Sequence, residues 1–183
     1  MSTVSTTGPG EIRPGDICLR KTERKVIGGF SFKRIFDYAT IQSVMINPFV
    51  YRAVSDDFSP RRDTFKARMD DEIWYVGGWH DQIKTAEFIG LWAFFPLSPI
   101  RWVVHTCLLP HARGLAIPAS RAMLDWMWAN SKVERIITDV PVSNRLALRL
   151  AKECGMEVIG TDRQSIRKGG KLQDQILLGL SKP

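Results

Sequence analysis

The chain has 183 residues, of which 44% are hydrophobic and 25% are charged, as in an ordinary globular protein. This length is enough for one well-packed domain and short for two, so we expect a flexible N-terminal segment over residues 1–15 and a single domain over residues 16–183. The net charge of +7 suits an anionic ligand, a nucleic acid or an acidic surface. Because the basic residues are scattered, a dedicated nucleic-acid-binding arm is not expected.

Several features predict a cytoplasmic protein without a membrane partner. The N-terminus has neither the basic region nor the apolar region of a signal peptide. The apolar run over residues 88–97 is too short to cross a bilayer. Cys18, Cys107 and Cys154 are too far apart for a zinc site or a disulfide framework, so we expect buried thiols and no metal.

The N-terminal half predicts a strand, a helix and a loop in that order. The first strand is expected within residues 17–30 and ends at Gly28-Gly29. Apolar residues at roughly helical spacing over residues 32–49 predict a helix that ends at Asn47-Pro48. Residues 56–71 are polar and form a surface loop.

The middle of the chain is rich in strands. Strands are expected over residues 73–79, 85–95 and 101–109. The first two are joined by a hairpin turn at His80-Asp81-Gln82, which places His80 at the surface. The third strand is apolar at nearly every position, as in a strand that is buried on both faces.

In the C-terminal half the pattern alternates between helices and strands. Helices are expected from about Pro118 to Asn130 and from Ser143 or Asn144 to Gly155. Strands are expected over residues 133–140, 156–166 and 172–180. A run of strands followed by alternating elements predicts an α/β fold with a mixed sheet and helices packed on it.

The segment over residues 105–118, HTCLLPHARGLAIP, is the most informative part of the sequence. It predicts a strand that stops at Pro110, a turn through Arg113-Gly114 and a helix that starts near Pro118. Free backbone N–H groups at such a junction can bind a phosphate or a pyrophosphate. A simple tight turn before a helix is the alternative interpretation.

Two motifs in this order resemble the GNAT superfamily of acyl-CoA N-acyltransferases. The superfamily's cofactor motif, Gln/Arg-x-x-Gly-x-Gly/Ala, corresponds to His111–Ala116, and its later motif, Asn-x-x-Ala-x-x-Leu-Tyr-x-x-x-Gly-Phe, corresponds to Asn144–Met156. The order of elements from about Phe32 onward is also similar. The resemblance implies a mixed, mostly antiparallel central sheet with flanking helices. It also implies acetyl-CoA as cofactor and direct attack by an amine.

The resemblance further implies which residues hold the cofactor. These are Leu108, Leu109, Arg113, Gly114, Leu115, Ala116 and Asn144. Asn144 is equally the expected N-cap of the helix that follows it. Two positions depart from the family pattern. His111 replaces the usual Gln or Arg, and Ala151 replaces the tyrosine that often protonates the CoA thiolate, so no proton donor stands at that position.

His105 and Glu87 are the candidate catalytic bases. An imidazole within the apolar strand could act as a general base, or relay to one, near neutral pH; the alternative is a hydrogen-bonded core histidine. Glu87, on the preceding strand, is the second candidate, and its alternative is a solvent-facing residue. Asp56-Asp57 could attract a cationic amine or simply cap a loop.

The segments over residues 47–57, 90–96, 105–110 and 174–183 resemble, more specifically, GNAT-like proteins of tailed bacteriophages and prophages. Three functions therefore stay open. The protein could be an acetyltransferase acting on an amine of a small molecule or a protein. It could instead be an inactive component of a phage particle, a possibility that Ala151 also suggests. The third possibility is a phage effector that acts on a host protein.

Overall fold

The computed structural model describes residues 25–81 and 86–183, and within these ranges eight strands form one sheet. The expected N-terminal segment, Cys18 and the turn residue Gln82 lie outside the described residues. The strands are β1 (Lys25–Ile27), β2 (Phe30–Ile35), β3 (Trp74–Asp81), β4 (Ala86–Pro96), β5 (Arg101–Leu108), β6 (Arg135–Pro141), β7 (Glu157–Lys168) and β8 (Lys171–Ser181). The helices are α1 (Tyr38–Met45), α2 (Pro48–Val54), the 3₁₀ helix η1 (Pro110–Leu115), α3 (Ala116–Asn130) and α4 (Arg145–Glu153).

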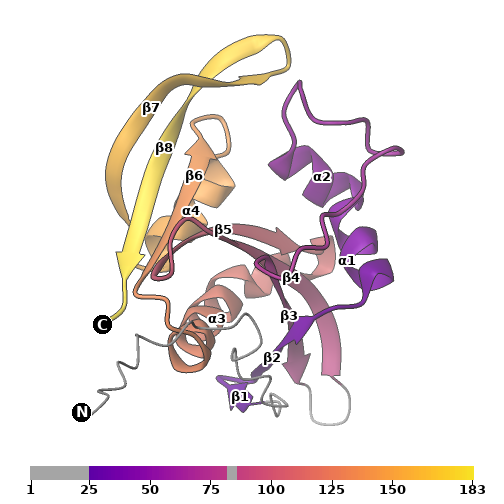
Figure 1. The fold of residues 1–183 in the computed structure, drawn as a ribbon, viewed down its shortest axis with the longest axis vertical. Coiled ribbons are helices and arrows are strands. Elements are labelled where there is room, and N and C mark those ends of the chain that lie inside the picture. The colour runs from indigo at the N-terminus through magenta and orange to yellow at the C-terminus, as the bar shows by residue number, and fades with distance from the viewer. Residues whose placement is uncertain (1–24, 82–85) are drawn as a thin grey trace, which may run out of the picture.

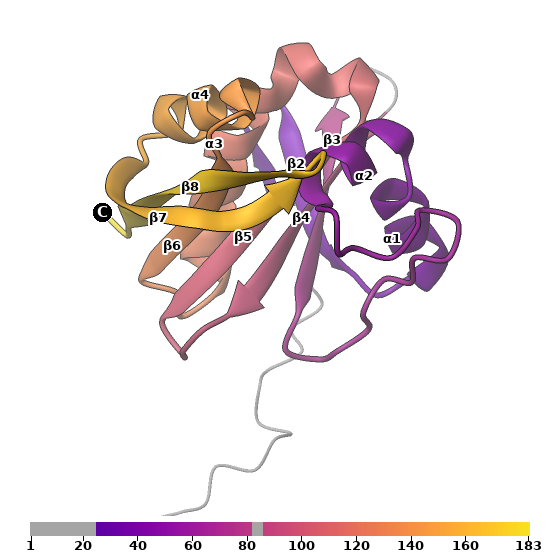
Figure 2. The ribbon, with the colours of Figure 1, turned by 90° about the horizontal axis from the view of Figure 1, so that it is seen from above.

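The strand order in the sheet is β1-β2-β3-β4-β5-β6-β8-β7. Every pair of neighbours is antiparallel except β5 and β6, which are parallel. This arrangement confirms the expected mixed, mostly antiparallel α/β fold. Helices α1 and α2 cover one face of the sheet, and α3 and α4 cover the other (Figures 1 and 2).

Each face of the sheet has its own hydrophobic core. Trp92 and Phe94 of β4 pack against Met123 and Trp126 of α3, and all four are almost completely buried. On the opposite face, the second cluster joins strand residues to α1 and α2; it comprises Ile35, Ile41, Val44, Met45, Val50, Ala67, Ile73, Tyr75, Leu91, Ala93 and Cys107. Cys107 is buried as expected, whereas Cys154 is only partly buried.

The helix expected over residues 32–49 is wrong, because the segment contains a strand and two short helices. Phe32 is fully buried within β2, which pairs with β3 along its whole length, so sheet pairing outweighs the approximate helical spacing. Asp37 then caps α1 by accepting a hydrogen bond of 2.8 Å from the backbone N–H three residues later. Asn47 caps α2, and Pro48 occupies its first turn.

His80 is also misplaced by the sequence pattern. It lies within β3, between Phe30 of β2 and Glu87 of β4, and not in a turn. Its ring is partly buried, with its centroid 5.2 Å from that of Phe30. The strand continues to Asp81 because its N–H donates to the carbonyl of Gly29 at 2.9 Å and the residue pairs with Ala86 of β4.

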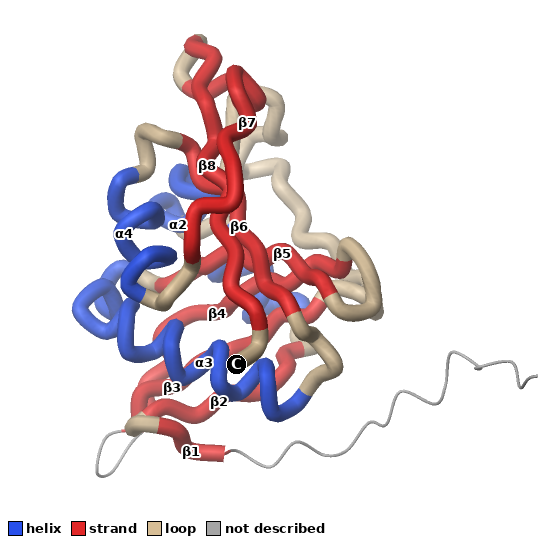
Figure 3. The backbone as a smooth tube through the Cα atoms, turned by 90° about the vertical axis from the view of Figure 1, so that its left-hand side faces the viewer, coloured by secondary structure: helices blue, strands red, loops and turns tan. Residues whose placement is uncertain are grey.

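The parallel pair β5 and β6 opens after only three residue pairs. Pairing runs from Arg101↔Arg135 to Val103↔Ile137 and then stops, while β5 stays paired to β4 and β6 stays paired to β8. Figure 3 shows β5 and β6 diverging, with α4 to their left and α3 below them. The opening between the two strands positions the candidate site.

Candidate active site

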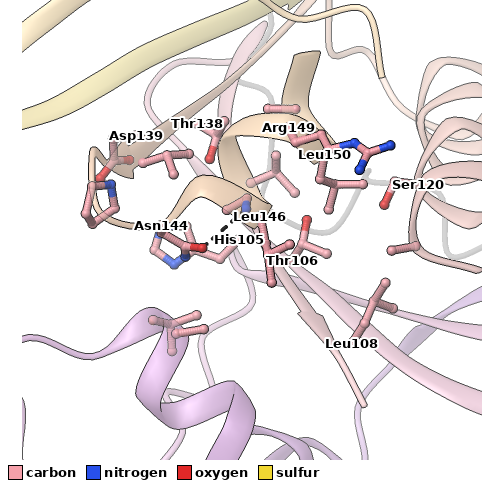
Figure 4. Close-up of a pocket in the computed structure, with 18 of the residues that line it drawn as sticks. His105, Thr106, Leu108, Ser120, Thr138, Asp139, Asn144, Leu146, Arg149 and Leu150 are labelled. Atoms are coloured by element: carbon pink, nitrogen blue, oxygen red, sulfur yellow. Dashed lines mark hydrogen bonds between the residues drawn. The ribbon is translucent and has the colours of Figure 1, made fainter. Parts of the chain in front are cut away.

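A cavity of about 720 Å³ lies where β5 and β6 part. This volume is within the range of roughly 300–1,000 Å³ that is typical of small-molecule sites. Residues of both helical layers line it, so it passes through the opening from one face of the sheet to the other (Figure 4). A cavity of this shape can admit two molecules from opposite faces and bring them together at the strands.

Side-chain alternation divides the lining residues into two groups. We refer to the face that carries α3 and α4 as the α4 side; its strand residues are Val104, Thr106, Leu108, Thr138 and Val140. The face that carries α1 and α2 is the α2 side. Its lining residues are His105, Asp139, Ser165, Ile166 and Gln175, together with Phe49, Val50, Ala53, Val54, Ser55, Asp56 and Ser59 of α2 and the loop after it. His105 pairs with Ala93, which belongs to the core cluster on that face.

His105 and Asp139 occupy equivalent positions on the two strands. Each lies two residues beyond the last parallel pair, Val103↔Ile137, so both side chains emerge on the α2 side across the opening from each other. The His105 ring packs on Phe95, with the centroids 5.2 Å apart. Within the described residues, no hydrogen-bond partner is found for either ring nitrogen.

Burial lowers the pKa of His105 below 6.5, and the negative charge of Asp139 opposes part of this shift. Burial therefore favours the neutral imidazole, which is the form that can accept a proton. A buried neutral imidazole with unbonded nitrogens, facing a cavity, has the properties that proton abstraction from an amine requires.

Asp139 is held by β8, a contact that the sequence did not predict. Gln175 of β8 donates a hydrogen bond of 2.8 Å from Nε2 to Oδ2 of Asp139. The two residues meet because β6 and β8 pair in antiparallel register up to Pro141↔Gln175. No local sequence signal marks this pair, since it depends on the register of two strands that are far apart in the chain.

The expected turn through Arg113-Gly114 is a 3₁₀ helix, η1, that leads directly into α3. Helix α3 begins at Ala116, two residues before the expected start, because Pro118 fits within its first turn. Gly114 has no positive φ, and a methyl group added there would meet nothing within 4 Å. The fold itself therefore does not require glycine at this position, whereas a ligand that approaches the backbone closely would.

The predicted cofactor-binding residues fall into two groups. Those that line the cavity are Leu108, Arg113, Ala116 and Asn144. Those that do not line it are Leu109, Gly114 and Leu115. The backbone N–H of Leu109 is bonded to the carbonyl of Ile89 at 3.0 Å, and Leu115 packs against the core on the α3 face.

Asn144 is the N-cap of α4, as one interpretation of the sequence predicted. Its Oδ1 accepts a hydrogen bond of 3.2 Å from the N–H of Ala147, and the residue also lines the cavity. Figure 4 shows Asn144 close to His105 in the view, with Asp139 on one side and Arg149 on the other. Capping and ligand contact are therefore compatible at this position.

Sequence reasoning missed two further cavity residues on the α4 side. Ser120 of α3 is 4% exposed, and its hydroxyl accepts a hydrogen bond of 3.2 Å from Nε1 of Trp92. Arg149 of α4 also lines the cavity and is labelled in Figure 4. Ala151, at the family's tyrosine position, also lines the cavity, as does Cys154, where burial raises the thiol pKa to about 11.

Glu87 does not come near His105. It lies at the start of β4, six residues before Ala93, the partner of His105. Its Oε1 is 3.6 Å from Nε2 of His111, and both side chains are about half exposed. Glu87 does not line the cavity, so its role as a base stays a prediction that the geometry does not favour.

The fold and the cavity can now be compared with known proteins. The family model of the acetyltransferase (GNAT) domain matches residues 18–157, and the chain therefore belongs to the GNAT acetyltransferase family. No curated protein sequence matches the chain significantly. Among the described residues, no helix is both long and apolar enough to span a membrane.

Solved structures of acetyltransferases share this fold. Ribosomal-protein-S5-alanine acetyltransferase from Vibrio fischeri superposes with a TM-score of 0.66 at 15% identity, over 88% of this chain and 100% of that chain. Spermidine N-acetyltransferase from Vibrio cholerae, in complex with CoA and spermine, gives 0.67 at 16% identity, over 84% and 95%. A GNAT-family acetyltransferase from Bacillus anthracis gives 0.61 at 17% identity, over 87% and 95%.

Proposed function

We propose that the protein is an N-acetyltransferase that transfers an acetyl group from acetyl-CoA to an amine by direct attack. The observation that carries this proposal is the position of His105, a neutral imidazole at the point where the cavity crosses the sheet. Membership of the GNAT family supports the reaction class. The two Vibrio relatives act, by their names, on a protein alanine and on spermidine, and both of these acceptors are amines.

The α4 side fits acetyl-CoA as the donor. Arg113 and Arg149 supply positive charge for its phosphates, and the open space beside Gly114 allows a phosphate group to approach the backbone. Leu108 and Asn144 would contact the pantetheine arm. When bound, acetyl-CoA supplies an acetyl group activated as a thioester.

The chain's own contribution to the transfer is to orient the amine and to remove its proton. An amine attacks only when its nitrogen has a free lone pair, and His105 takes the surplus proton at an unbonded ring nitrogen, directly or through one water. The charge of Asp139 across the opening stabilises the imidazolium that results. Because Ala151 has no proton to give, the thiolate is protonated by water or by another donor.

Two other functions compete with the transferase. An inactive component of a phage particle would need no cavity that crosses the sheet and no buried imidazole facing it, so these observations favour the enzyme. An effector that modifies a host protein differs only in its acceptor. It uses the same donor site and the same base.

Calorimetric titration and a turnover assay test the proposal. We expect the wild-type protein to bind acetyl-CoA and to acetylate at least one member of a panel of small amines and lysine peptides. His105→Asn should keep the binding but lose about 100-fold or more in kcat/KM, the usual contribution of a general base. A protein that binds neither acetyl-CoA nor CoA would overturn the proposal.

A further inference from the structure

The α2 side of the cavity is bridged by contacts between two segments that are distant in sequence. Loop residue Asp57 accepts hydrogen bonds from the backbone N–H groups of Gly169 and Gly170, at 2.8 and 2.7 Å. Its own N–H donates to the carbonyl of Arg167 at 2.9 Å. The two glycines have φ of +62° and +76°, the left-handed conformation that points both N–H groups at one carboxylate.

Lys168 strengthens the same bridge. Its ammonium donates to the carbonyls of Arg52, Ala53 and Ser55 at 2.8, 3.3 and 2.9 Å, which places one acceptor around each of its hydrogens. Burial lowers the pKa of Lys168, and Asp56 partly opposes this shift. We refer to the contacts of Asp57 and Lys168 together as the clasp.

The clasp joins the outer ends of two walls of the cavity. Ser55, Asp56 and Ser59 line the cavity from the loop after α2, and Ser165 and Ile166 line it from β7. Figures 1 and 2 both show the turn between β7 and β8 close to this loop. An acceptor on the α2 side therefore lies beneath a bridged wall and not in an open groove.

The charged lining residues are distributed unevenly over the cavity. Apart from His105, the charged side chains that line it among the described residues are two basic and two acidic ones. The basic ones are Arg149 of α4 and Arg113 of η1, and the guanidinium of Arg113 lies over the ring of Phe49 of α2, 4.9 Å from its centroid. The acidic ones, Asp56 and Asp139, are both on the α2 side. Lys168, which interacts with Asp56, is held by three carbonyls and does not line the cavity, so the two lining carboxylates make this part of the cavity complementary to a cation.

We propose, resting on the proposed function, that the acceptor is a slender aliphatic amine with a second cationic group, and that the clasp enforces this choice. The two carboxylates select positive charge. The bridged wall admits a flexible chain, and it excludes an amine that projects from a folded protein surface.

Acetylation of two probes tests both parts of the inference. The probes are 1,5-diaminopentane and folded ubiquitin, whose lysines carry the same aminoalkyl group on a protein surface. We expect wild-type protein to acetylate the diamine with a higher kcat/KM than it does ubiquitin. Asp57→Ala and Lys168→Met should each lower the ratio of kcat/KM for the diamine to kcat/KM for ubiquitin by roughly tenfold or more. 1-Aminopentane, which lacks the second charge, should have a lower kcat/KM than 1,5-diaminopentane. Asp139→Asn should reduce the difference in kcat/KM between these two amines.

Matched controls separate the clasp from a general loss of charge. Asp63→Ala removes a carboxylate of the same loop that pairs with the exposed Arg61, and Lys171→Met removes an exposed cation from the same hairpin. Both should leave the ratio unchanged. Backbone hydrogen exchange gives a readout that is independent of activity, since the amides of Gly169 and Gly170 should exchange slowly in wild-type protein and faster in Asp57→Ala.

The outcomes distinguish this inference from the proposed function. If Asp57→Ala speeds exchange at both glycines but leaves the ratio unchanged, the clasp does not select the acceptor. If a protein that binds acetyl-CoA acetylates ubiquitin and not the diamine, the substrate class is wrong while the transferase proposal stands. Unaltered exchange in Asp57→Ala overturns the clasp itself, and absence of acetyl-CoA binding overturns both proposals.

Discussion

The pKa of His105 is set by two opposing effects of its surroundings. Burial lowers the pKa of the imidazole, and the carboxylate of Asp139 raises it by a smaller amount. We therefore expect an NMR titration to place the wild-type pKa below 6.5. Asp139→Asn removes the opposing charge, so the pKa of His105 should fall further.

The control for this titration is Asp125→Asn, which removes an exposed carboxylate of α3 that does not line the cavity. It should leave the pKa of His105 unchanged. A higher pKa in Asp139→Asn than in wild-type protein would show that the carboxylate does not face the imidazole.

Gly90 and Gly114 are both near the cavity, but only one of them is required by the fold. A methyl group at Gly90 would lie 2.5 Å from the carbonyl oxygen of Cys107, and its φ is +129°. Gly90→Ala should therefore lower the free energy of unfolding by about 2 kcal/mol or more, measured by denaturant titration.

Gly114→Val should behave in the opposite way. The added side chain meets no neighbouring atoms at its Cβ, so the free energy of unfolding should change by less than about 1 kcal/mol. The side chain would instead fill the space proposed for a phosphate group, and calorimetry should show roughly tenfold weaker binding of acetyl-CoA. Unchanged affinity in a folded variant would remove Gly114 from the donor site.

At the scale of elements, the N-terminus of α4 combines a structural role and a proposed binding role in Asn144. Asn144→Ala removes the cap and should cost about 1 kcal/mol of stability. Asn144→Asp keeps a capping oxygen, so stability should be retained, while the added negative charge weakens acetyl-CoA binding. If Asn144→Asp binds acetyl-CoA as wild-type protein does, Asn144 acts only as a cap.

The elements differ in how far the sequence could predict them. Helix α4 was predictable because its cap, its apolar face and the stop at Gly155 (φ +86°) are all local signals. Strand β2 was not, because its pairing with β3, about 45 residues away, decides its conformation. The succession of strands and helices after Pro96 was predictable from composition and turns, whereas the parting of β5 and β6 was not predicted.

The candidate site shows the same division. His105 and Asn144 could be singled out as candidates because each residue type is distinctive in its local context, and both line the cavity. Asp139 and Gln175 were missed, since only the register of β6 and β8 brings them together. The role of Asp57 depends on glycines more than 110 residues away, so a doublet of aspartates in a loop could suggest only a cap or a cation site.

At the scale of the whole molecule, the parting of β5 and β6 links the two helical layers through one cavity. Parallel strands normally continue to pair, and here β5 and β6 give up further hydrogen bonds to form a passage. A donor that fills the α4 side would connect η1, α3 and α4 to the strands. Binding of the donor should therefore raise the free energy of unfolding of the whole domain.

This linkage gives a quantitative expectation for thermal unfolding. A ligand that binds only the folded state at 100 times its Kd stabilises it by about 2.7 kcal/mol. For a chain of 183 residues, that corresponds to a rise in Tm of roughly 5–10 °C. Acetyl-CoA should produce this rise in wild-type protein and in His105→Asn, because the imidazole acts on the acceptor. At the same ligand concentration, Gly114→Val should lose about 1.4 kcal/mol of the stabilisation, since its affinity is tenfold lower. A rise that is equal in Gly114→Val and wild-type protein would place the donor elsewhere than the α4 side.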